Sequence, residues 1–596
     1  MRRLTNRIVL FWRTPQQWLG WLFLAVFGYL IIVPLGQMAV ATFQVQRGDV
    51  RRTGEDVGTW TLYYWDRLFT GPISDALFYR PLYNTIIVSF AYTLLAMVLG
   101  LAFAWLLVKT DIPYKKFIAI TILIPYIVPS WSIALAWLTL LGNHRVGIGA
   151  PGLLQSVLGI VPADWLVYGP VPIVIVLSLN YFAFTFLLAS AALSSLDASL
   201  EESAVLHGAG GSTILRRITL PLLLPALGSA FILTFAQGLG TFGVPAILGI
   251  PARFNVLATS LYQSIGGGRM GDGLALTLVL VAVAGLTIYM NSLLLGKRKQ
   301  FTAITGKGTF HRRVPLGPWR HPVSVAVFIF LFLVAFLPVI LLLWRSLQLN
   351  LGDFSLSNLT LTYWIGHIDA FDGILVDPRV HAAAWNTLRL GLVVGVATAV
   401  IGIFSGYVVS KARGSRLAQL VEQLVFVPYL IPGIAFGAIY LMMFSRPQGP
   451  IPVLYGTLTI MILAAVVNRL PFASRTGITA MMQLDRSLEE AAEIHGASFS
   501  TRLRRVVIPL TRKGLLAGFI LSFVNTVKDL SLVIMLVAPQ TMVLTALTYG
   551  YIEIGRRQFA DALALVLVIM ALGSTWLAQW LTKTNPLEGF GGSSHQ

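Results

Sequence analysis

The chain has 596 residues, of which 56% are hydrophobic and only 11% are charged, and its mean hydropathy is +0.77. This composition is typical of a polytopic membrane protein and excludes an ordinary soluble domain. The formal net charge is +19, but the basic residues are spread between apolar runs, as on cytoplasmic loops, so we expect no nucleic-acid partner. The absence of cysteine excludes disulfides, thiolate metal sites and thiol nucleophiles.

The first half of the chain alternates apolar runs with short polar loops. Residues 1–17 are basic, and the apolar run at about 18–43 is too long for a signal-peptide core, so we expect a retained first span. An aromatic-rich polar stretch at roughly 44–80 is typical of a membrane surface. Further spans of about 20 residues or more are predicted at 83–108, 117–141, 170–192, 222–248 and 273–296.

The second half repeats this plan after the most basic segment, 297–321, which we expect to be a cytoplasmic linker. Its spans are predicted at 322–346, 386–409, 417–443, 454–478, 512–537 and 560–582, and residues 583–596 form a tail. The sequence thus predicts an all-α polytopic membrane protein with about twelve spans in two homologous six-helix halves, 18–296 and 322–582. The basic loops at 109–116 and 411–416 and both termini then lie in the cytoplasm.

Two polar loops, 193–221 and 479–511, carry the clearest sign of duplication. Ten of the fourteen residues in Leu196–Ala209 (LDASLEESAVLHGA) are identical in Leu484–Ala497 (LDRSLEEAAEIHGA), without a gap. The same offset of 288 residues joins the prolines that end the loops, Pro221 and Pro509. A match at one fixed offset indicates an internal repeat.

Other repeated motifs extend the duplication over most of the chain. They are Pro125-Tyr-x-x-Pro129 with Pro428-Tyr-x-x-Pro432, Asn84-Thr85 with Asn386-Thr387, Asn180 with Asn468, and Asp272 with Asp561. Six spans per repeat is an even number, so the halves should run parallel, related by an axis along the membrane normal. The proline pairs predict kinked or broken third and ninth spans.

Each polar loop is predicted to form two short helices joined at a glycine. Either Asp197 or Ser199 caps the first helix, and the helix dipole favours the two glutamates in its opening turn. Gly208 permits the positive φ that ends this helix, and Pro221 suits the first turn of the next one.

The sequence Glu202-Ser-Ala-x-x-x-Gly208, followed after nine residues by Ile-x-Leu-Pro221, resembles the EAA signature of binding-protein-dependent ABC importer permeases. Glu490-Ala-Ala-x-x-x-Gly496 with Val-x-Ile-Pro509 matches it again, whereas Ser203 departs from the usual alanine. The resemblance implies that each loop is a coupling helix seated in a cleft of a separate ABC ATPase. The residues expected at these contacts are Glu202, Ala204, Gly208, Pro221, Glu490, Ala491, Ala492, Gly496 and Pro509.

The family resemblance also implies the partners and the location. They are two copies of an ATPase that binds ATP and magnesium, an extracytoplasmic solute-binding protein, and the bilayer of the bacterial inner membrane. The chain itself has no Gly-x-x-x-x-Gly-Lys-Ser/Thr motif, and Gly306-Lys307 lacks the first glycine. No His-Glu-x-x-His spacing and no nucleophile–base set stands out, so we expect a transport subunit without enzymatic activity, cofactor or metal.

Ionisable residues within spans mark candidate functional positions. Lys528 and Asp529 lie in the predicted eleventh span, where the first half has Gly240 and Thr241, so a charged site here breaks the two-fold symmetry. The resemblance implies that the fifth span of each half lines the pathway, so Gln237, Asn525, Lys528 and Asp529 are candidate pathway residues. The alternatives are an ion pair that only holds helices together, or a position nearer the membrane surface.

The overall resemblance is to ferric-iron permeases, while thiamine, phosphonate, polyamine and sulfate-type importers share the architecture. A secondary transporter of the major facilitator type also has two parallel six-helix halves. It should carry Gly-x-x-x-Asp-Arg/Lys-x-Gly-Arg-Arg after its second span, but this chain has Lys109-Thr-Asp-Ile-Pro-Tyr-Lys-Lys116 there. A membrane scaffold or sensor would need a soluble signalling domain, and no polar segment is long enough for one.

Overall fold

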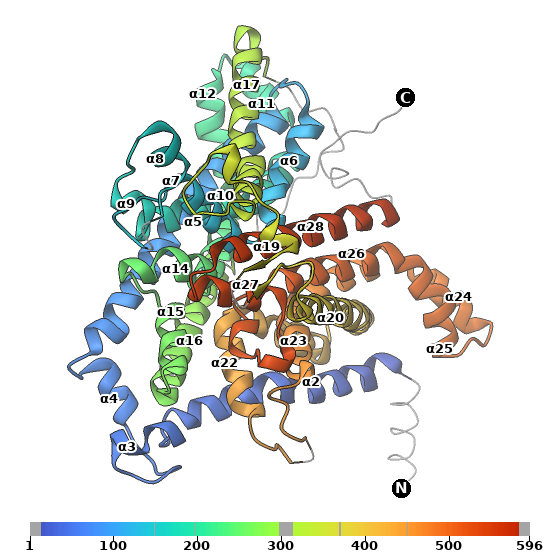
Figure 1. The fold of residues 1–596 in the computed structure, drawn as a ribbon. Coiled ribbons are helices and arrows are strands. Elements are labelled where there is room, and N and C mark those ends of the chain that lie inside the picture. Colours follow the sequence, from blue (N-terminus) through green and yellow to red (C-terminus); the bar gives the residue numbers. More distant parts are fainter. Residues whose placement is uncertain are drawn as a thin grey trace.

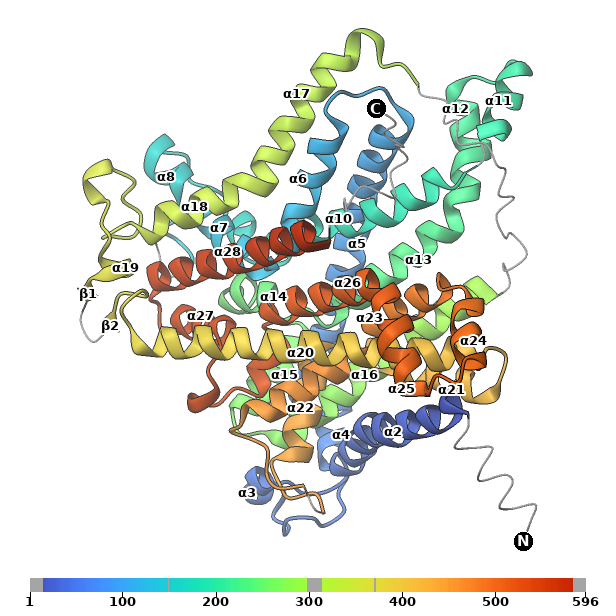
Figure 2. The same ribbon diagram turned by 90° about the vertical axis from the view of Figure 1, so that its right-hand side faces the viewer.

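The computed structural model describes residues 14–147, 150–196, 198–296, 314–368, 371–449 and 451–582, and it is almost entirely helical (Figures 1 and 2). Within these residues, ten helices are long and apolar enough to cross a membrane, or twelve if two sharply bent pairs count as one span each. The prediction of an all-α polytopic protein with about twelve spans is therefore confirmed. The basic N-terminal segment up to Arg13 and the tail 583–596 lie outside the described residues.

The spans follow the same order in both halves. Those of the first half are α2 (Pro15–Ala41), α5 (Arg80–Lys109), α6 (Lys115–Ile127) with α7 (Ser130–Leu141), α10 (Pro170–Ser194), α13 (Leu220–Leu239) and α16 (Met270–Gly296). Those of the second half are α17 (Arg320–Leu331) with α18 (Leu337–Ser346), α20 (Pro378–Lys411), α21 (Arg416–Phe426) with α22 (Gly433–Phe444), α23 (Leu458–Met482), α26 (Ile508–Val527) and α28 (Arg557–Thr582).

Short elements connect the spans on both sides. On the side of the polar loops these are α11 (Ala198–Leu206), α12 (Gly211–Ile214), α24 (Arg486–Ile494) and α25 (Phe499–Arg502). Elsewhere they are α3 (Val50–Thr53), α4 (Tyr63–Phe69), α8 (Leu153–Leu158), α9 (Asp164–Val167), α14 (Gly243–Leu248), α15 (Leu257–Gly266), α19 (Thr362–Ile365) and α27 (Leu544–Glu553). Strands β1 (His367–Ile368) and β2 (Phe371–Asp372) form a small antiparallel hairpin.

The two halves exchange helices. Each half has its own three-helix core, α5, α10 and α13 in the first and α20, α23 and α26 in the second. However, α2 packs against α20, α21 and α22, and the α17–α18 span packs against α6 and α7 (Figure 2). Each half therefore presents its first span to the other, which buries apolar surface between halves joined by only one linker.

Pairs of hydrogen bonds show that the sequence repeat is also a structural repeat. The Asn84 side chain donates to the Asn255 carbonyl at 2.8 Å, and Asn386 donates to the Met542 carbonyl at 3.0 Å. The neighbouring threonine hydroxyls accept the first amides of α15 and α27, at 2.8 and 2.9 Å respectively. In each half the Asn-Thr motif thus attaches the start of the second span to the segment that follows the fifth.

A buried ion pair lies near the start of the last span in each half. Arg67 lies 3.3 Å from Asp272, and the Arg345 guanidinium forms a two-point bond with Asp561. Both carboxylates have side chains that are at most 1% exposed. Because an unpaired charge at such a depth is costly, these pairs explain why the aspartates occur at equivalent places in both halves.

Four helical stretches carry a five-residue π turn that ends two residues before a proline. The turns are Asp75–Tyr79, Leu215–Thr219, Phe332–Phe336 and Leu503–Val507, and the prolines are Pro81, Pro221, Pro338 and Pro509. Proline lacks an N–H and its ring clashes with the carbonyl four residues earlier, so a wider turn lets the helix continue. Pro221 and Pro509 therefore lie within helical stretches running from Gly211 to Leu239 and from Phe499 to Val527, instead of opening separate helices.

The third and ninth spans are broken, as their prolines predicted. The chain bends by 94° between α6 and α7 and by 102° between α21 and α22, at Pro129 and Pro432 respectively. The predicted limits of the fifth and eleventh spans, 222–248 and 512–537, are wrong at both ends. These helices start in the polar loops and stop at Leu239 and Val527, because the chain turns where it meets the broken helices of the opposite half.

Close backbone contact holds α20 against α23 in the second half. A Cβ added at Gly477 would lie 1.8 Å from the Gly402 carbonyl oxygen, so only glycine fits at this crossing. Small residues of this kind let membrane helices approach until their backbones touch.

The end of the linker is attached to the short basic loop at 109–116. The Val314 amide donates to the Lys109 carbonyl at 2.7 Å, and the Leu316 amide donates to an Asp111 carboxylate oxygen at 2.8 Å. This amide lowers the pKa of Asp111 because it stabilises the charged carboxylate. Residues 297–313 lie outside the described residues.

Candidate translocation cavity and coupling loops

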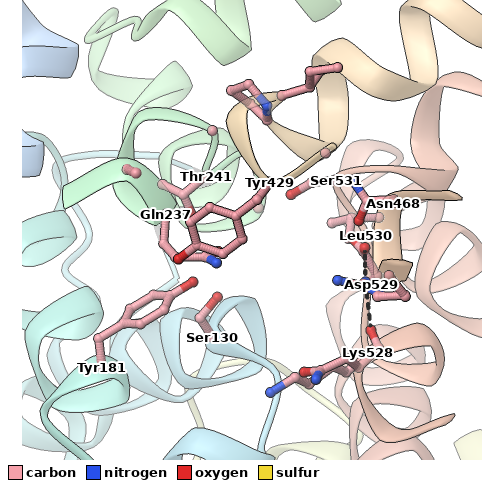
Figure 3. A pocket seen from close by; sticks show the side chains of 18 of the residues that line it. Ser130, Tyr181, Gln237, Thr241, Tyr429, Asn468, Lys528, Asp529, Leu530 and Ser531 are labelled. Atoms are coloured by element: carbon pink, nitrogen blue, oxygen red, sulfur yellow. Dashed lines mark hydrogen bonds and ion pairs between the residues drawn. The ribbon is translucent and has the colours of Figure 1, made fainter. Parts of the chain in front are cut away.

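A cavity of about 190 Å³ lies between the two halves, where both helix breaks meet the ends of α13 and α26 (Figure 3). Its polar lining comes from both halves and includes Tyr126, Ser130, Asn180, Tyr181, Gln237, Thr241, Tyr429, Asn468, Arg469, Asn525, Lys528, Asp529 and Ser531. Broken helices leave backbone groups without helical partners, and such groups are tolerated within a membrane where they line a cavity. This position makes the cavity the candidate translocation site.

All four candidate pathway residues line this cavity, namely Gln237, Asn525, Lys528 and Asp529. Lys528 and Asp529 are not within the eleventh span as predicted, because α26 ends at Val527 and both residues lie in the turn that follows. The turn brings the charged groups to the cavity wall. Their part in solute movement stays a prediction.

Asp529 forms an ion pair with Arg469, which lies on α23. The same guanidinium donates to the Asn525 carbonyl at 3.1 Å, and the other carboxylate oxygen of Asp529 accepts the Leu532 amide at 3.2 Å. Sequence reasoning missed Arg469, although a charged residue inside the predicted span 454–478 was a usable signal. The pair joins the tenth span to the end of the eleventh within the second half.

Lys528 reaches across to the first half. Its ammonium donates to the Tyr126 carbonyl at 2.5 Å, at the break between α6 and α7, and lies 4.5 Å from the centre of the Tyr126 ring. The carbonyl dipole and the ring face attract a cation, but neither carries a full negative charge. At the equivalent contact, Gly240 meets Pro432, where an added Cβ would lie 2.4 Å from the proline ring. One contact between the halves is therefore charged and the other apolar.

The wall opposite the charged residues carries hydroxyl and amide groups. In Figure 3, the side chains of Ser130, Tyr181, Gln237 and Tyr429 lie across the cavity from Lys528 and Asp529. Tyr429 and Gln237 come from different halves, and both line the cavity. Sequence reasoning missed these tyrosines as site residues, although Tyr126 and Tyr429 belong to the repeated proline motif.

The first glutamate of each polar loop anchors the loop to its own half. Glu201 accepts hydrogen bonds from Lys109 Nζ and from the Thr219 hydroxyl, both at 2.8 Å. Glu489 lies 2.6 Å from Lys411 Nζ and accepts a hydrogen bond from the Tyr407 hydroxyl at 2.8 Å. In both loops the lysine is the last residue of the second span of that half. A buried ion pair thus joins each polar loop to a membrane-spanning helix.

The second glutamate of each loop, Glu202 or Glu490, is exposed. So are two apolar residues at equivalent places, Leu206 at 86% and Ile494 at 84%. Ala204 and Ala492 are half-buried, whereas Ala491 is exposed. Because a strongly exposed apolar side chain recurs at the same place in both loops, Leu206 and Ile494 are candidate contacts with another protein.

The loop glycines adopt the predicted backbone conformation, with φ of +80° at Gly208 and +78° at Gly496. No atom lies within 4 Å of a Cβ added at either position, so both face open space. Asp197 lies outside the described residues, but its counterpart Asp485 accepts the Ser487 amide and so caps α24. This hydrogen bond lowers the pKa of Asp485. Among the described residues, no group of three or more His, Cys, Asp or Glu side chains could hold a metal ion.

Comparison with known proteins identifies a family that matches most of the chain. The model of the binding-protein-dependent transport system inner membrane component matches residues 96–350 and again 398–584. The chain is 27% identical over 512 residues to the ferric transport system permease protein FbpB of Actinobacillus pleuropneumoniae, covering 84% of this chain and 71% of that protein. It is 26% identical over 240 residues to the putative 2-aminoethylphosphonate transport system permease protein PhnV of Salmonella typhimurium, covering 40% and 84%.

Among solved structures, the chain is similar to a bacterial ABC transporter involved in the import of the acidic polysaccharide alginate. That match has a TM-score of 0.37 at 16% identity and covers 44% of this chain and 95% of the other. The two family matches each contain one of the polar loops, and they rule out the major facilitator alternative. This chain belongs to the family of binding-protein-dependent transport system inner membrane components and is a permease of an ABC importer.

Proposed function

We propose that this permease imports ferric iron, which an extracytoplasmic binding protein delivers to the cavity between the two halves. Two copies of a separate ATPase drive the import from the cytoplasmic side. Each half of the chain supplies one coupling loop, so one polypeptide provides both sides of the pathway.

The single observation that carries the proposal is the pair of equivalent loops. Each presents an exposed glutamate and an exposed apolar tip at the same offset, Glu202 with Leu206 and Glu490 with Ile494. Both loops lie on one side of the molecule, the side at which α2 begins (Figure 2). Two matched surfaces on one face suit two copies of one partner. The buried ion pairs Lys109–Glu201 and Lys411–Glu489 would transmit the movement of that partner to α5 and α20.

The ATP-binding site belongs to the partner in this proposal. The chain has no phosphate-binding loop of its own, so ATP and magnesium bind the ATPase and this chain holds no cofactor. Closure of the two ATPase copies would bring the coupling loops together and switch the halves between inward-facing and outward-facing states. The excess of basic residues on the short loops supports a cytoplasmic coupling side. We propose that both chain termini lie on that side and that the spans lie in the inner membrane of a bacterium.

Ferric iron is proposed because relatives that cover most of this chain are described as ferric transport permeases, from two species at 27% identity. Thiamine, phosphonate, polyamine and sulfate-type substrates remain the alternatives. Phosphonate has a specific observation in its favour, since the 2-aminoethylphosphonate permease is similar to part of this chain.

Uptake by whole cells tests the proposal. The gene is deleted in its own host and restored as wild type or as the double variant G208D/G496D, and accumulation of radiolabelled ferric citrate is measured. We expect uptake to fall on deletion, return with the wild type and stay low with the double variant. Iron uptake that is unchanged by deletion would contradict the ferric assignment, and parallel measurements with labelled 2-aminoethylphosphonate would identify the alternative.

A further inference from the structure

The charged groups of the cavity do not cancel. Asp529 pairs with Arg469, so these two residues neutralise each other. Lys528 is a second basic residue, and in the described part of the chain it makes no ion pair with a carboxylate. The cavity lining therefore has two basic side chains and one carboxylate.

The positive charge is a property of one half only. The first-half equivalents of Arg469, Lys528 and Asp529 are Tyr181, Gly240 and Thr241, all of them uncharged. Among the buried ion pairs, Arg67–Asp272 and Arg345–Asp561 place an aspartate at equivalent positions in both halves, whereas Arg469–Asp529 has no first-half counterpart. The asymmetry indicates that the charge serves something that meets both walls at once.

The facing wall supplies neutral hydrogen-bond donors. The hydroxyls of Ser130, Tyr181 and Tyr429 and the amide of Gln237 lie across the cavity from Lys528 (Figure 3). Hydroxyl and amide groups donate well to anionic oxygens, and a buried ammonium is stabilised by an oxyanion far more than by a carbonyl oxygen. A cation in the same place would be repelled by Lys528 and would meet only one carboxylate, which already has a partner.

We infer that the cavity binds an oxyanion, with Lys528 as its charge partner and the hydroxyl wall as its donors. The inference deepens the proposed function, on which it rests: iron crosses as a ferric complex that carries anionic oxygens, and bare ferric cation is excluded. It also separates the alternatives, since phosphonate and sulfate fit the cavity charge whereas thiamine and polyamines do not.

Lys528 can then bind only one of two partners at a time. In the unloaded cavity its ammonium donates a hydrogen bond to the Tyr126 carbonyl of the opposite half. An arriving oxyanion draws the ammonium away and releases this contact between the halves. Substrate charge is thereby linked to the separation of the halves that transport requires.

The test is equilibrium dialysis of the full chain in lipid nanodiscs against radiolabelled phosphate, methylphosphonate, ferric citrate and spermidine. We expect the wild type to retain at least one anionic probe and to exclude spermidine. K528Q should weaken anion retention about tenfold or more, since a charge-assisted bond is lost, and K528R should keep it. The matched control is K513Q, because Lys513 is an exposed lysine on α26, the helix that precedes Lys528, and lies outside the cavity.

The probes distinguish the sources of the oxyanion. Retention of ferric citrate without phosphate or methylphosphonate indicates a metal-bearing complex, and retention of all three indicates that the oxyanion suffices. Retention of spermidine, absence of every anion, or equal anion retention by wild type and K528Q would overturn the inference. These results are independent of the cell uptake assay, which can fail for iron while the cavity still binds phosphonate in a Lys528-dependent way.

Discussion

Replacing the buried glutamate of a coupling loop by alanine should release that loop from the membrane-spanning helices. In the first loop, E201A removes the partner of Lys109, whose side chain is only 4% exposed, and also the acceptor for the Thr219 hydroxyl. In the second loop, E489A removes the partner of Lys411 and of the Tyr407 hydroxyl. The lysines would then be left near the membrane without a carboxylate.

The expected magnitude follows from the burial of these pairs. Removing one member of a buried ion pair typically costs about 3–5 kcal/mol, because the other charge stays behind unpaired. Glu201 keeps 12% exposure, so water screens part of this cost and the lower end applies, about 3 kcal/mol. At about 1.4 kcal/mol per factor of ten, the detached state of the loop becomes roughly 100-fold more populated.

Hydrogen–deuterium exchange of the chain in nanodiscs measures this effect. We expect faster exchange in α11 for E201A and in α24 for E489A, each without change in the other loop. The matched controls are E202A and E490A, because these neighbouring glutamates are exposed and make no anchor. They should leave exchange unchanged and weaken only the binding of the ATPase. Unchanged exchange in E201A and E489A would refute the assigned anchor.

Further substitutions test three other parts of the molecule. G208D or G496D should abolish solute uptake, because both glycines have positive φ in the loop. The protein should still reach the membrane at its normal level, because both positions face open space. Wild-type uptake in both variants would exclude a coupling role. D529N should reduce uptake about tenfold or more, because Arg469 loses its charged partner. Unchanged uptake at unchanged expression would mean that the Arg469–Asp529 pair only holds helices together. G477A should lower the stability measured in a thermal melt by about 1–3 kcal/mol, because the added methyl group collides with the Gly402 carbonyl. The control G573A should not lower stability, because Gly573 lies within a helix and faces open space. Equal melts of the two variants would refute the close contact at Gly477.

The outline of the fold could be predicted because it depends on local composition. Spans follow from apolar length, the duplication from one fixed offset, and the helix breaks from Pro129 and Pro432. The exchange of α2 between halves could not be predicted, since it depends on which apolar faces meet after insertion. Neither could the ends of α13 and α26, where the chain turns to meet the opposite half.

The site could be predicted only in part, because it too depends on which distant segments of the chain meet. Gln237, Asn525, Lys528 and Asp529 could be singled out because the family resemblance implies that the fifth span of each half lines the pathway, and all four line the cavity. The partner of Asp529 is 60 residues away in the chain, so the sequence could mark Arg469 as a charged residue of a span but could not show that the two residues pair. Adjacent glutamates in each loop look alike in sequence, yet one is buried and one exposed, because burial depends on a lysine at the end of a distant helix.

Affinity purification from native membranes, with mass spectrometry of whatever accompanies the chain, tests the central claim most directly. The account predicts a phosphate-loop ATPase at two copies per permease, present with the wild type and lost from the G208D/G496D double variant. Purification of the chain without any ATPase, together with solute movement in proteoliposomes that needs no ATP, would contradict it.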